Sequence, residues 1–265
     1  MATEYDMSLR YGVDPDQSLT GRVALVTGGL GGIATAANEA MLAKGANIAI
    51  FYPEFESDRV DEVMAHYPAE RVKAWCCDVT SEQEVARGVR EVIEYFGDLH
   101  ILVNAAGTIT LTPAEDISLA EWQRQIDVCL TAPFICAREV GRHLLSSQHG
   151  GKIINIASQA ATVAIDHHCA YTSAKAGLIG MTKTLAKEWG PHGINVNTIS
   201  PTVVLTPMGA AAWQGEKGER MKSMIPTGRF AYTDEIAASI VFLASNSSDM
   251  INGADLLIDG GYTIW

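Results

Sequence analysis

Tyr171 and Lys175 stand four positions apart in a stretch with helical composition that runs on to Trp189. Residues at this spacing lie one above the other on a helix face. An ammonium group beside a phenol favours the phenolate and lowers the pKa of the tyrosine. We therefore interpret the pair as a candidate acid/base group that exchanges a proton with a substrate hydroxyl. Taken alone, the spacing is more typical of a solvated helix face, so the functional interpretation depends on the motifs in the rest of the chain.

A cluster of glycines lies at residues 27–33, between an apolar run at 23–26 and a helical pattern at 33–44. Glycines in a strand-to-helix turn let the backbone approach a pyrophosphate, and the first turn of the helix offers free N–H groups to the anion. Glycines are also ordinary turn residues. Their place at the first strand-to-helix junction of an alternating pattern favours a dinucleotide site.

The elements that would position these residues alternate along the chain. Apolar runs typical of strands buried on both faces occur at residues 23–26, 47–52, 72–77, 99–103, 152–157, 194–199 and 255–258. Helical spacing occurs at 33–44, 82–96, 119–145, 171–189 and 234–245. Alternating strands and helices pair in parallel with right-handed crossovers. The sequence therefore predicts an α/β, doubly wound fold, with helices on both faces of a seven-stranded parallel sheet.

Composition narrows the class of protein and its organisation. A net charge of −12 and a pI near 5.0 argue against a nucleic-acid or anionic-membrane partner. No apolar run is long enough to span a bilayer, and we expect no secretory signal in the polar, acidic residues 1–20. We interpret residues 1–20 as an N-terminal arm and 21–265 as one dinucleotide-binding domain. The five cysteines include no C-x-x-C pair, so we expect reduced thiols, a cytoplasmic location and no metal site.

Four further motifs follow the glycine cluster in order. They are Asp78-Val79 after the third expected strand, Asn-Ala-Ala-Gly at 104–107 after the fourth, Ser158 thirteen residues before Tyr171, and Pro-Thr-Val-Val-Leu-Thr at 201–206. Together the five resemble the short-chain dehydrogenase/reductase family, including its T-G-x-x-x-G-x-G loop, its N-N-A-G turn and its P-G-x-[IV]-x-T segment. The resemblance extends from residue 19 to the C-terminus. It implies a Rossmann fold and hydride transfer between NAD or NADP and a secondary alcohol or ketone.

The resemblance also implies roles for individual residues. Tyr171 would be the general acid/base, Lys175 would hold the nicotinamide ribose and lower the pKa of Tyr171, and Ser158 would bond the substrate oxygen. The residues expected to bind the cofactor are Gly28, Leu30, Gly32, Ile33, Tyr52, Asp78, Val79, Asn104, Ala105, Gly107, Tyr171, Lys175, Pro201, Val204, Thr206 and Met208.

The chain departs from the family pattern at several positions. Ala34 replaces the last glycine of the loop, and Thr202 replaces the glycine after Pro201. Cys129 stands where the family has an asparagine that supports a water linking Lys175 to solvent. A thiol is a weak hydrogen-bonding group, so this proton relay would be weakened. Alternatively, Cys129 is a small core residue and a backbone carbonyl holds the water.

A fourth departure concerns the choice of cofactor. Tyr52 ends the second expected strand, where users of NAD commonly carry an acid that bonds the adenosine ribose. A user of NADP would need Arg or Lys in the loop or just after this strand. Leu30 and Pro53 supply no such charge, and Arg59 is seven residues away. The sequence therefore favours NAD, with NADP as the alternative.

Several segments resemble the polyol (sugar-alcohol) dehydrogenase branch of the family, namely 199–209, 225–230 and 258–264. We expect residues 203–225 to form a mobile lid because they contain several glycines. Trp213 in this lid either lines the pocket or anchors the lid. His168 either faces the substrate or is structural.

The sequence thus predicts an NAD-dependent oxidoreductase that interconverts a small polyol and its ketose. The alternatives are an NADPH-dependent ketone or 3-oxoacyl reductase, and a cofactor-binding sensor or scaffold without turnover. The resemblance further implies a homotetramer, assembled through the helices at 119–145 and 171–189 and the apolar C-terminal segment.

Overall fold

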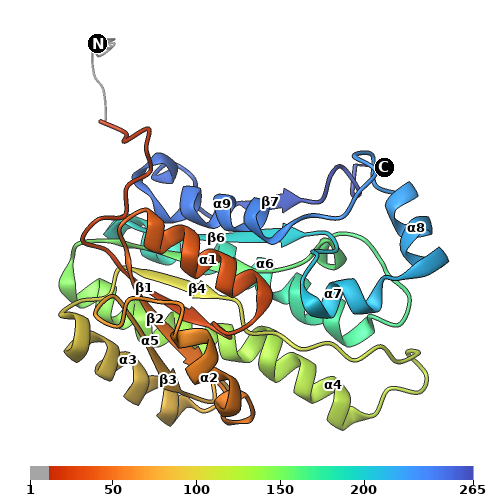
Figure 1. Cartoon of the computed structure of the whole chain (residues 1–265), viewed down its shortest axis with the longest axis horizontal. Coiled ribbons are helices and arrows are strands. Elements are labelled where there is room, and N and C mark those ends of the chain that lie inside the picture. Colours follow the sequence, from red (N-terminus) through yellow and green to blue (C-terminus); the bar gives the residue numbers. More distant parts are fainter. Residues whose placement is uncertain (1–11, 265) are drawn as a thin grey trace.

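The computed structural model describes residues 12–264, and Met208 by its backbone alone. Residues 1–11 of the expected arm and Trp265 lie outside the described range. The described chain contains one parallel sheet in the order β3-β2-β1-β4-β5-β6-β7 (Figure 1), so the predicted seven-stranded parallel fold is confirmed. Its strands are β1 Val23–Thr27, β2 Asn47–Tyr52, β3 Val72–Cys76, β4 Ile101–Asn104, β5 Gly151–Ile156, β6 Ile194–Pro201 and β7 Asp255–Ile258.

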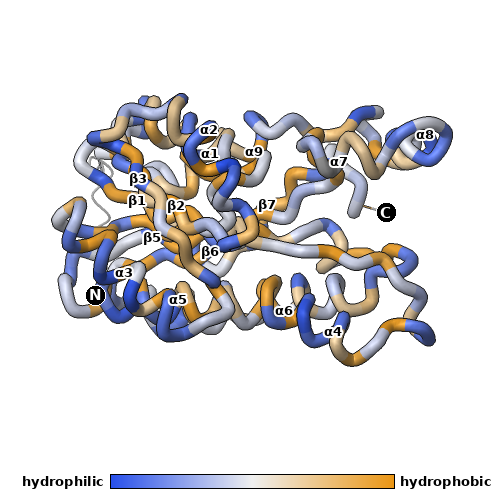
Figure 2. Tube along the Cα trace, turned by 60° about the horizontal axis from the view of Figure 1, so that its bottom comes forward, coloured by the Kyte–Doolittle hydropathy of each residue, from blue (hydrophilic) through white to orange (hydrophobic). Residues whose placement is uncertain are grey.

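Two layers of helices enclose the sheet. Figure 2 shows α1, α2 and α9 on one side and α3, α5 and α6 on the other. Each side has its own buried apolar cluster, which explains why β1 and β4 are buried at every position. The helices are α1 Gly32–Ala43, α2 Ser57–Met64, α3 Glu82–Phe96, α4 Leu119–Ile126, α5 Ala132–Ser147, α6 Cys169–Trp189, α7 Pro207–Ala212, α8 Gly215–Ser223 and α9 Thr233–Ala244. None of the described helices is both long and apolar enough to cross a membrane.

The strand order reverses between β1 and β4, and this reversal positions the candidate site. Thr27 at the end of β1 pairs with Phe51 on one side and with Asn104 on the other. Asn104 pairs in turn with Asn155 of β5. The carboxyl ends of these strands therefore lie level at one edge of the sheet, on the side where α7 lies (Figure 1). Open α/β sheets bind ligands in the crevice at such a switch point.

The long helix expected at 119–145 is interrupted, which corrects the prediction. A π-helical segment, Asp127–Thr131, separates α4 from α5, and the N–H of Ala132 donates to the carbonyl of Asp127 five residues earlier. Pro133 explains the break, because it has no N–H to give to the carbonyl of Cys129 as an α-helix would require. Short helices α2, α7 and α8 were not predicted. The third strand ends one residue earlier than expected, and the fourth runs from Ile101 to Asn104 rather than from 99 to 103.

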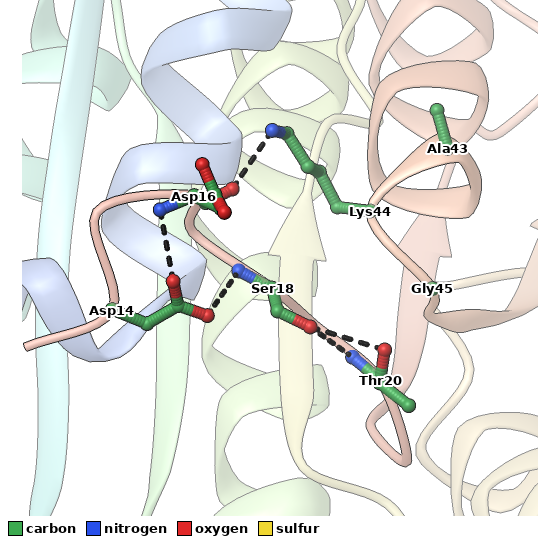
Figure 3. A pocket seen from close by; sticks show the side chains of 7 residues that line it. All are labelled: Asp14, Asp16, Ser18, Thr20, Ala43, Lys44 and Gly45. Carbon is green, nitrogen blue, oxygen red and sulfur yellow. Dashed lines mark hydrogen bonds between the residues drawn. The ribbon is translucent and has the colours of Figure 1, made fainter.

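Residues 14–20, the described end of the expected arm, lie against the turn between α1 and β2 (Figure 3). The side chain of Leu19 is only 1% exposed, and its N–H donates to the carbonyl of Lys44 at 2.7 Å. The ammonium group of Lys44 donates in return to the carbonyl of Asp16 at 2.8 Å. This segment is therefore held by the fold through backbone groups as well as by an apolar anchor.

Candidate active site

The glycine loop after β1 and the turn after β4 are tied together at the carboxyl edge of the sheet. The hydroxyl of Thr27 accepts hydrogen bonds from the N–H groups of Ala105 and Ala106, at 3.1 and 3.2 Å. Gly28 adopts a positive φ of 61°, and a Cβ there would lie 2.8 Å from the Cα of Ala106. Only glycine fits at this position, because the backbone is left-handed and the neighbouring turn is in contact.

The start of α1 has the properties of an anion site. Gly31 occupies the N-cap, and no side chain accepts the N–H groups of the first turn. Such groups, together with the helix dipole, attract phosphate. The buried amide of Asn38 holds the loop from behind by donating to the carbonyl of Gly29 at 2.9 Å. A Cβ on Gly32 would meet the side chain of Thr206 at 2.8 Å, so the start of the expected lid lies directly against the loop. The loop fits the pyrophosphate of a dinucleotide.

The region after β2 and β3 carries charges of both signs. Glu54 accepts a hydrogen bond from the thiol of Cys76 at 2.9 Å, and this bond raises the pKa of Cys76 to about 11. Burial raises the pKa of Tyr52, as do nearby Cys76 and Glu54. Arg59 reaches back from α2, so that its guanidinium lies 3.5 Å from the carbonyl of Leu30 and pairs with Glu56 at 3.3 Å. The sequence reasoning set Arg59 aside because it did not foresee α2, which brings the residue to the loop.

Ser158, Tyr171 and Lys175 are brought together beyond the end of β5. The hydroxyl of Ser158 accepts the N–H of Ala160 at 3.1 Å and also bonds the hydroxyl of Tyr171. Lys175 is 4% exposed, and its ammonium group donates to the carbonyl of Ile156 at 2.6 Å. The same ammonium group lies 5.7 Å from the centre of the Tyr171 ring. The predicted spacing thus places the tyrosine and the lysine on one face of α6, against the edge of the sheet.

The direction of the Tyr171 pKa shift differs from our expectation. Burial raises the pKa of Tyr171, the neighbouring thiol of Cys129 adds to the increase, and the hydrogen bond to Ser158 opposes it. The lysine does not reverse this shift, because its ammonium group is engaged by the carbonyl of Ile156 rather than by the phenol. Burial also lowers the pKa of Lys175. The protein alone therefore holds Tyr171 as a neutral phenol and favours its role as a proton donor.

Behind these residues lies a network of buried amides that the sequence reasoning missed. Asn104 donates to the side-chain oxygen of Asn155 at 2.8 Å, and Asn155 donates to the hydroxyl of Thr182 on α6 at 2.8 Å. The network joins β4, β5 and α6, so it fixes the height of α6 above the sheet. The signal in the sequence was a polar residue near the end of each of two apolar strands.

Cys129 is fully buried in the π-helical segment, and its thiol donates to the carbonyl of Thr108 at 3.2 Å. The thiol of Cys129 adds to the increase in the pKa of Tyr171 and opposes the decrease in the pKa of Lys175, so it lies near this pair. Its own carbonyl receives no N–H from Pro133 and can hold a water. Both parts of the alternative interpretation, a packed thiol and a backbone relay, are compatible with this geometry.

We expect the Cys129→Asn variant to unfold more easily, by about 1–3 kcal/mol, because part of the larger amide would be buried without a partner. Turnover should fall or stay unchanged if the backbone carbonyl holds the water. Thermal unfolding and a pH–rate profile for alcohol oxidation measure both effects, with Cys129→Ser as a size-matched control. A variant that is faster at low pH with an unchanged melting temperature would instead assign the relay to the side chain at position 129.

The substrate side of the site is formed by the start of α6 and the segment after β6. The ring of His168 meets Tyr171 edge-on at 6.2 Å between centroids, and its Nδ1 lies 2.6 Å from the carbonyl of Asp166. Trp213 packs on Phe230 at 6.2 Å and lies under the ammonium group of Lys217 at 4.4 Å, which supports its interpretation as an anchor of the lid. His168 is thus close to the phenol, whereas Trp213 is held by residues of the lid region.

The remaining expected cofactor residues occupy the same edge of the sheet. Asp78 and Val79 follow β3, Gly107 has open space above it, Pro201 ends β6 and Val204 pairs with Ala231. Met208 is the second residue of α7, and its side chain is outside the described part of the chain. The backbone therefore gathers all the predicted cofactor positions around the carboxyl ends of β1 to β6.

Comparisons with known proteins agree with this geometry. Residues 28–263 match the family model described as enoyl-(acyl carrier protein) reductase. The chain is 48% identical to a D-threitol dehydrogenase from Mycolicibacterium smegmatis, over 95% of the chain and 96% of that protein. It is 42% identical to an NAD-dependent glycerol dehydrogenase from Listeria innocua, over 96% of the chain and 98% of that protein. The predicted likeness to polyol dehydrogenases is confirmed by these relatives.

A solved short-chain dehydrogenase/reductase from Serratia marcescens superimposes with a TM-score of 0.85 at 33% identity, covering 92% of this chain and 99% of that one. The family assignment rests on two kinds of finding. The carboxyl edge of the sheet carries a glycine loop together with a serine, a tyrosine and a lysine, and the relatives match this chain over nearly their whole length. The chain belongs to the short-chain dehydrogenase/reductase family of NAD(P)-dependent oxidoreductases.

Proposed function

We propose that this protein oxidises a secondary alcohol of a small polyol to the ketone with NAD and catalyses the reverse reduction. The observation that carries the proposal is the convergence of Ser158, Tyr171 and Lys175 beside the glycine loop. Two relatives are named as dehydrogenases of D-threitol and of glycerol, and these names support a polyol substrate.

Each of the three side chains has a group suited to its role. The hydroxyl of Ser158 accepts the N–H of Ala160 and bonds the hydroxyl of Tyr171, so a substrate oxygen that enters between the two hydroxyls would take over the hydrogen of Ser158. Tyr171 takes the proton of the alcohol during oxidation and returns it during reduction. Lys175 uses one of its three donors on Ile156 and keeps two for a ribose hydroxyl and a water.

NAD supplies the hydride acceptor, and the loop between β1 and α1 would hold its pyrophosphate. We propose NAD rather than NADP because Glu54 lies two residues beyond Tyr52, near the end of β2 where a ribose hydroxyl is recognised, and its carboxylate would repel a 2′-phosphate. Of the other residues assigned by sequence, Leu30, Ile33, Tyr52, Asp78, Val79, Ala105, Pro201, Val204 and Met208 remain proposed cofactor contacts. His168 remains a proposed substrate contact, and Trp213 is proposed to anchor the lid.

Initial rates with D-threitol, glycerol and D-arabinitol, each with NAD and with NADP, test the proposal. We expect kcat/KM with NAD to exceed that with NADP at least about tenfold, equivalent to 1.4 kcal/mol of discrimination. Glu54→Gln should narrow this ratio. Binding of NADH, seen by tryptophan quenching, without turnover of any polyol or ketone would contradict the proposal and leave a sensor or scaffold.

One observation favours a second function, an NADPH-dependent ketone or 3-oxoacyl reductase. Arg59 lies 3.5 Å from the carbonyl of Leu30, within reach of a phosphate bound at the glycine loop. The Arg59→Ala variant separates the two functions. It should leave the rates with NAD unchanged under our proposal, and it should lower the rates with NADPH sharply under the alternative.

We further propose that the enzyme is cytoplasmic and binds neither nucleic acid nor membranes. Its resemblance to the short-chain dehydrogenase/reductase family leads us to propose that it assembles as a homotetramer. The proposed lid spans residues 203–225, which contain α7 and α8. The side chains of Leu257 and Ile264, near the C-terminal end of the described chain, are exposed, which supports an apolar contact in such an assembly. A monomeric mass in light scattering at micromolar concentration would contradict the tetramer.

A further inference from the structure

A second cluster of titratable side chains lies at the amino ends of β4 and β5, across the sheet from the site described above. Asp98 precedes β4, His143 is in the last two turns of α5, and His149 lies between α5 and β5. The carboxylate oxygen Oδ1 of Asp98 is 2.7 Å from Nε2 of His143 and 3.1 Å from Nε2 of His149. The three ligand atoms all lie within 4.8 Å of one another.

The proton on His149 can be assigned from its surroundings. Nδ1 lies 2.7 Å from the carbonyl of Gly150, which only accepts, so Nδ1 carries the hydrogen. A neutral ring then presents the lone pair of Nε2 to the carboxylate of Asp98. Two electron pairs at this distance repel unless a proton or a metal ion lies between them. A hydrogen bond from the second ring nitrogen to a backbone carbonyl is also the usual support of a metal-ligating histidine.

The carboxylate of Asp98 is similarly arranged. Its Oδ1 accepts the N–H of Leu99 at 2.7 Å, which uses one of its two lone pairs. Nε2 of His143 and Nε2 of His149 both lie near the remaining lone pair of Oδ1. On the other side, His100 accepts the N–H of Val23 through Nδ1 at 3.2 Å and therefore turns its protonated Nε2 toward Oδ2 of Asp98, at 3.5 Å. His100 thus orients the carboxylate and leaves Oδ1 to face the two imidazoles.

We propose that Asp98, His143 and His149 form a binding site for one divalent transition-metal ion, with Zn²⁺ as the best match. Two imidazoles and a carboxylate are a common zinc ligand set, and zinc–ligand distances of about 2.1 Å separate tetrahedral ligands by about 3.4 Å. The observed separations of 2.7 and 3.1 Å would have to widen slightly, and the two Nε2 atoms, which lie within 4.8 Å of each other, would have to adjust to the same spacing. The three side chains are 36%, 18% and 28% exposed, which leaves room for a water as the fourth ligand.

The ion would act as a structural clamp. It would join the segment before β4, the end of α5 and the segment before β5, all at the edge of the sheet remote from Tyr171. It would therefore stabilise the fold without entering the reaction. This also revises the expectation of no metal site, which rested on the cysteine pattern alone.

Titration of Zn²⁺ into untagged, chelator-treated protein tests the site. We expect one ion per chain by calorimetry and a rise in melting temperature, because the ion binds the folded chain. The double variant His143→Gln His149→Gln removes two ligands, so its affinity for Zn²⁺ should fall by more than the about 10–100-fold that is lost when a residue supporting a ligand is changed. The control is His66→Gln His192→Gln, which removes two exposed histidines outside the cluster and should bind like the parent.

A second measurement covers the case in which the double variant fails to fold. Co²⁺ added to the parent protein should give the visible absorption of a tetrahedral site, and one equivalent of Zn²⁺ should abolish it. Binding that persists in a folded double variant would place the ion elsewhere, for example at the exposed Cys169 and its neighbour His168. That result, or the absence of any stoichiometric binding to the parent, would overturn the proposal and leave Asp98 and its histidines as an ion-paired cluster.

Discussion

The Tyr171→Phe variant is expected to lose about 10²–10⁴-fold in kcat for polyol oxidation, the usual contribution of one acid/base group. The change removes only the hydroxyl that bonds Ser158 and keeps the ring that packs edge-on against His168. The cofactor contacts of the glycine loop are untouched. Fluorescence titration with NADH should therefore give nearly the parent affinity, while steady-state kinetics show the loss.

The pH dependence of the parent enzyme gives a second readout of the same role. Oxidation requires the phenolate, and burial raises the pKa of Tyr171 above its ordinary value in the protein alone. The rate of oxidation should therefore rise as the pH increases toward that pKa, and this dependence should be missing from the Tyr171→Phe variant. Tyr95→Phe, which removes the hydroxyl of a partly exposed tyrosine on α3, is the matched control. Near-normal turnover by Tyr171→Phe would exclude the assigned mechanism.

The parts of the fold and site that follow from local pattern were predictable. Strands buried on both faces give unbroken apolar runs such as 23–26, and their alternation with helices leaves few topologies. The parallel register then brings Thr27, Asn104 and Asn155 level without further information. The motifs that follow these strands therefore had to meet at one edge of the sheet, which is why the sequence could identify the site residues as a group.

The parts that depend on distant neighbours were not predictable. Nothing local indicates that the pKa of Tyr171 is raised, because the cause is burial, which is a property of the whole fold. Pro133 was visible, but its consequence, a π-helical segment within an apolar helical pattern, was not foreseen. Arg59 reaches the glycine loop only because α2 folds back. These are features in which tertiary packing overrides the sequence pattern.

The cluster around Asp98 could not be predicted from the sequence for the same reason. Its histidines lie 45 and 51 residues away along the chain, so no spacing motif marks them. Metal sites in short motifs are recognisable because their ligands share one turn or hairpin. Here the ligands come from three separate segments that only the crossover of α5 brings together.

Replacement of Lys175 should damage both cofactor binding and turnover, in contrast to Tyr171→Phe. Lys175→Met keeps the length of the buried side chain and removes its charge and its three donors. A hydrogen bond to a charged group contributes about 1.5–3 kcal/mol, so the loss of the proposed ribose contact should weaken NAD binding about 10–100-fold. The loss of the ammonium group should also disfavour the phenolate of Tyr171 and shift the rise of the oxidation rate to higher pH.

The stability of this variant separates a catalytic role from a structural one. Burial lowers the pKa of Lys175, so the fold gains little from holding its charge in place. The carbonyl of Ile156 would lose the donor that lies 2.6 Å away, at a cost of about 1–3 kcal/mol.

Lys183→Met, at an exposed position two turns further along α6, is the control for the loss of a lysine from this helix. Calorimetric titration with NAD, pH–rate profiles and thermal unfolding of the three proteins measure these effects. A Lys175→Met enzyme whose activity falls only in proportion to its unfolded fraction, with parent affinity for NAD, would show that Lys175 supports the fold rather than the reaction.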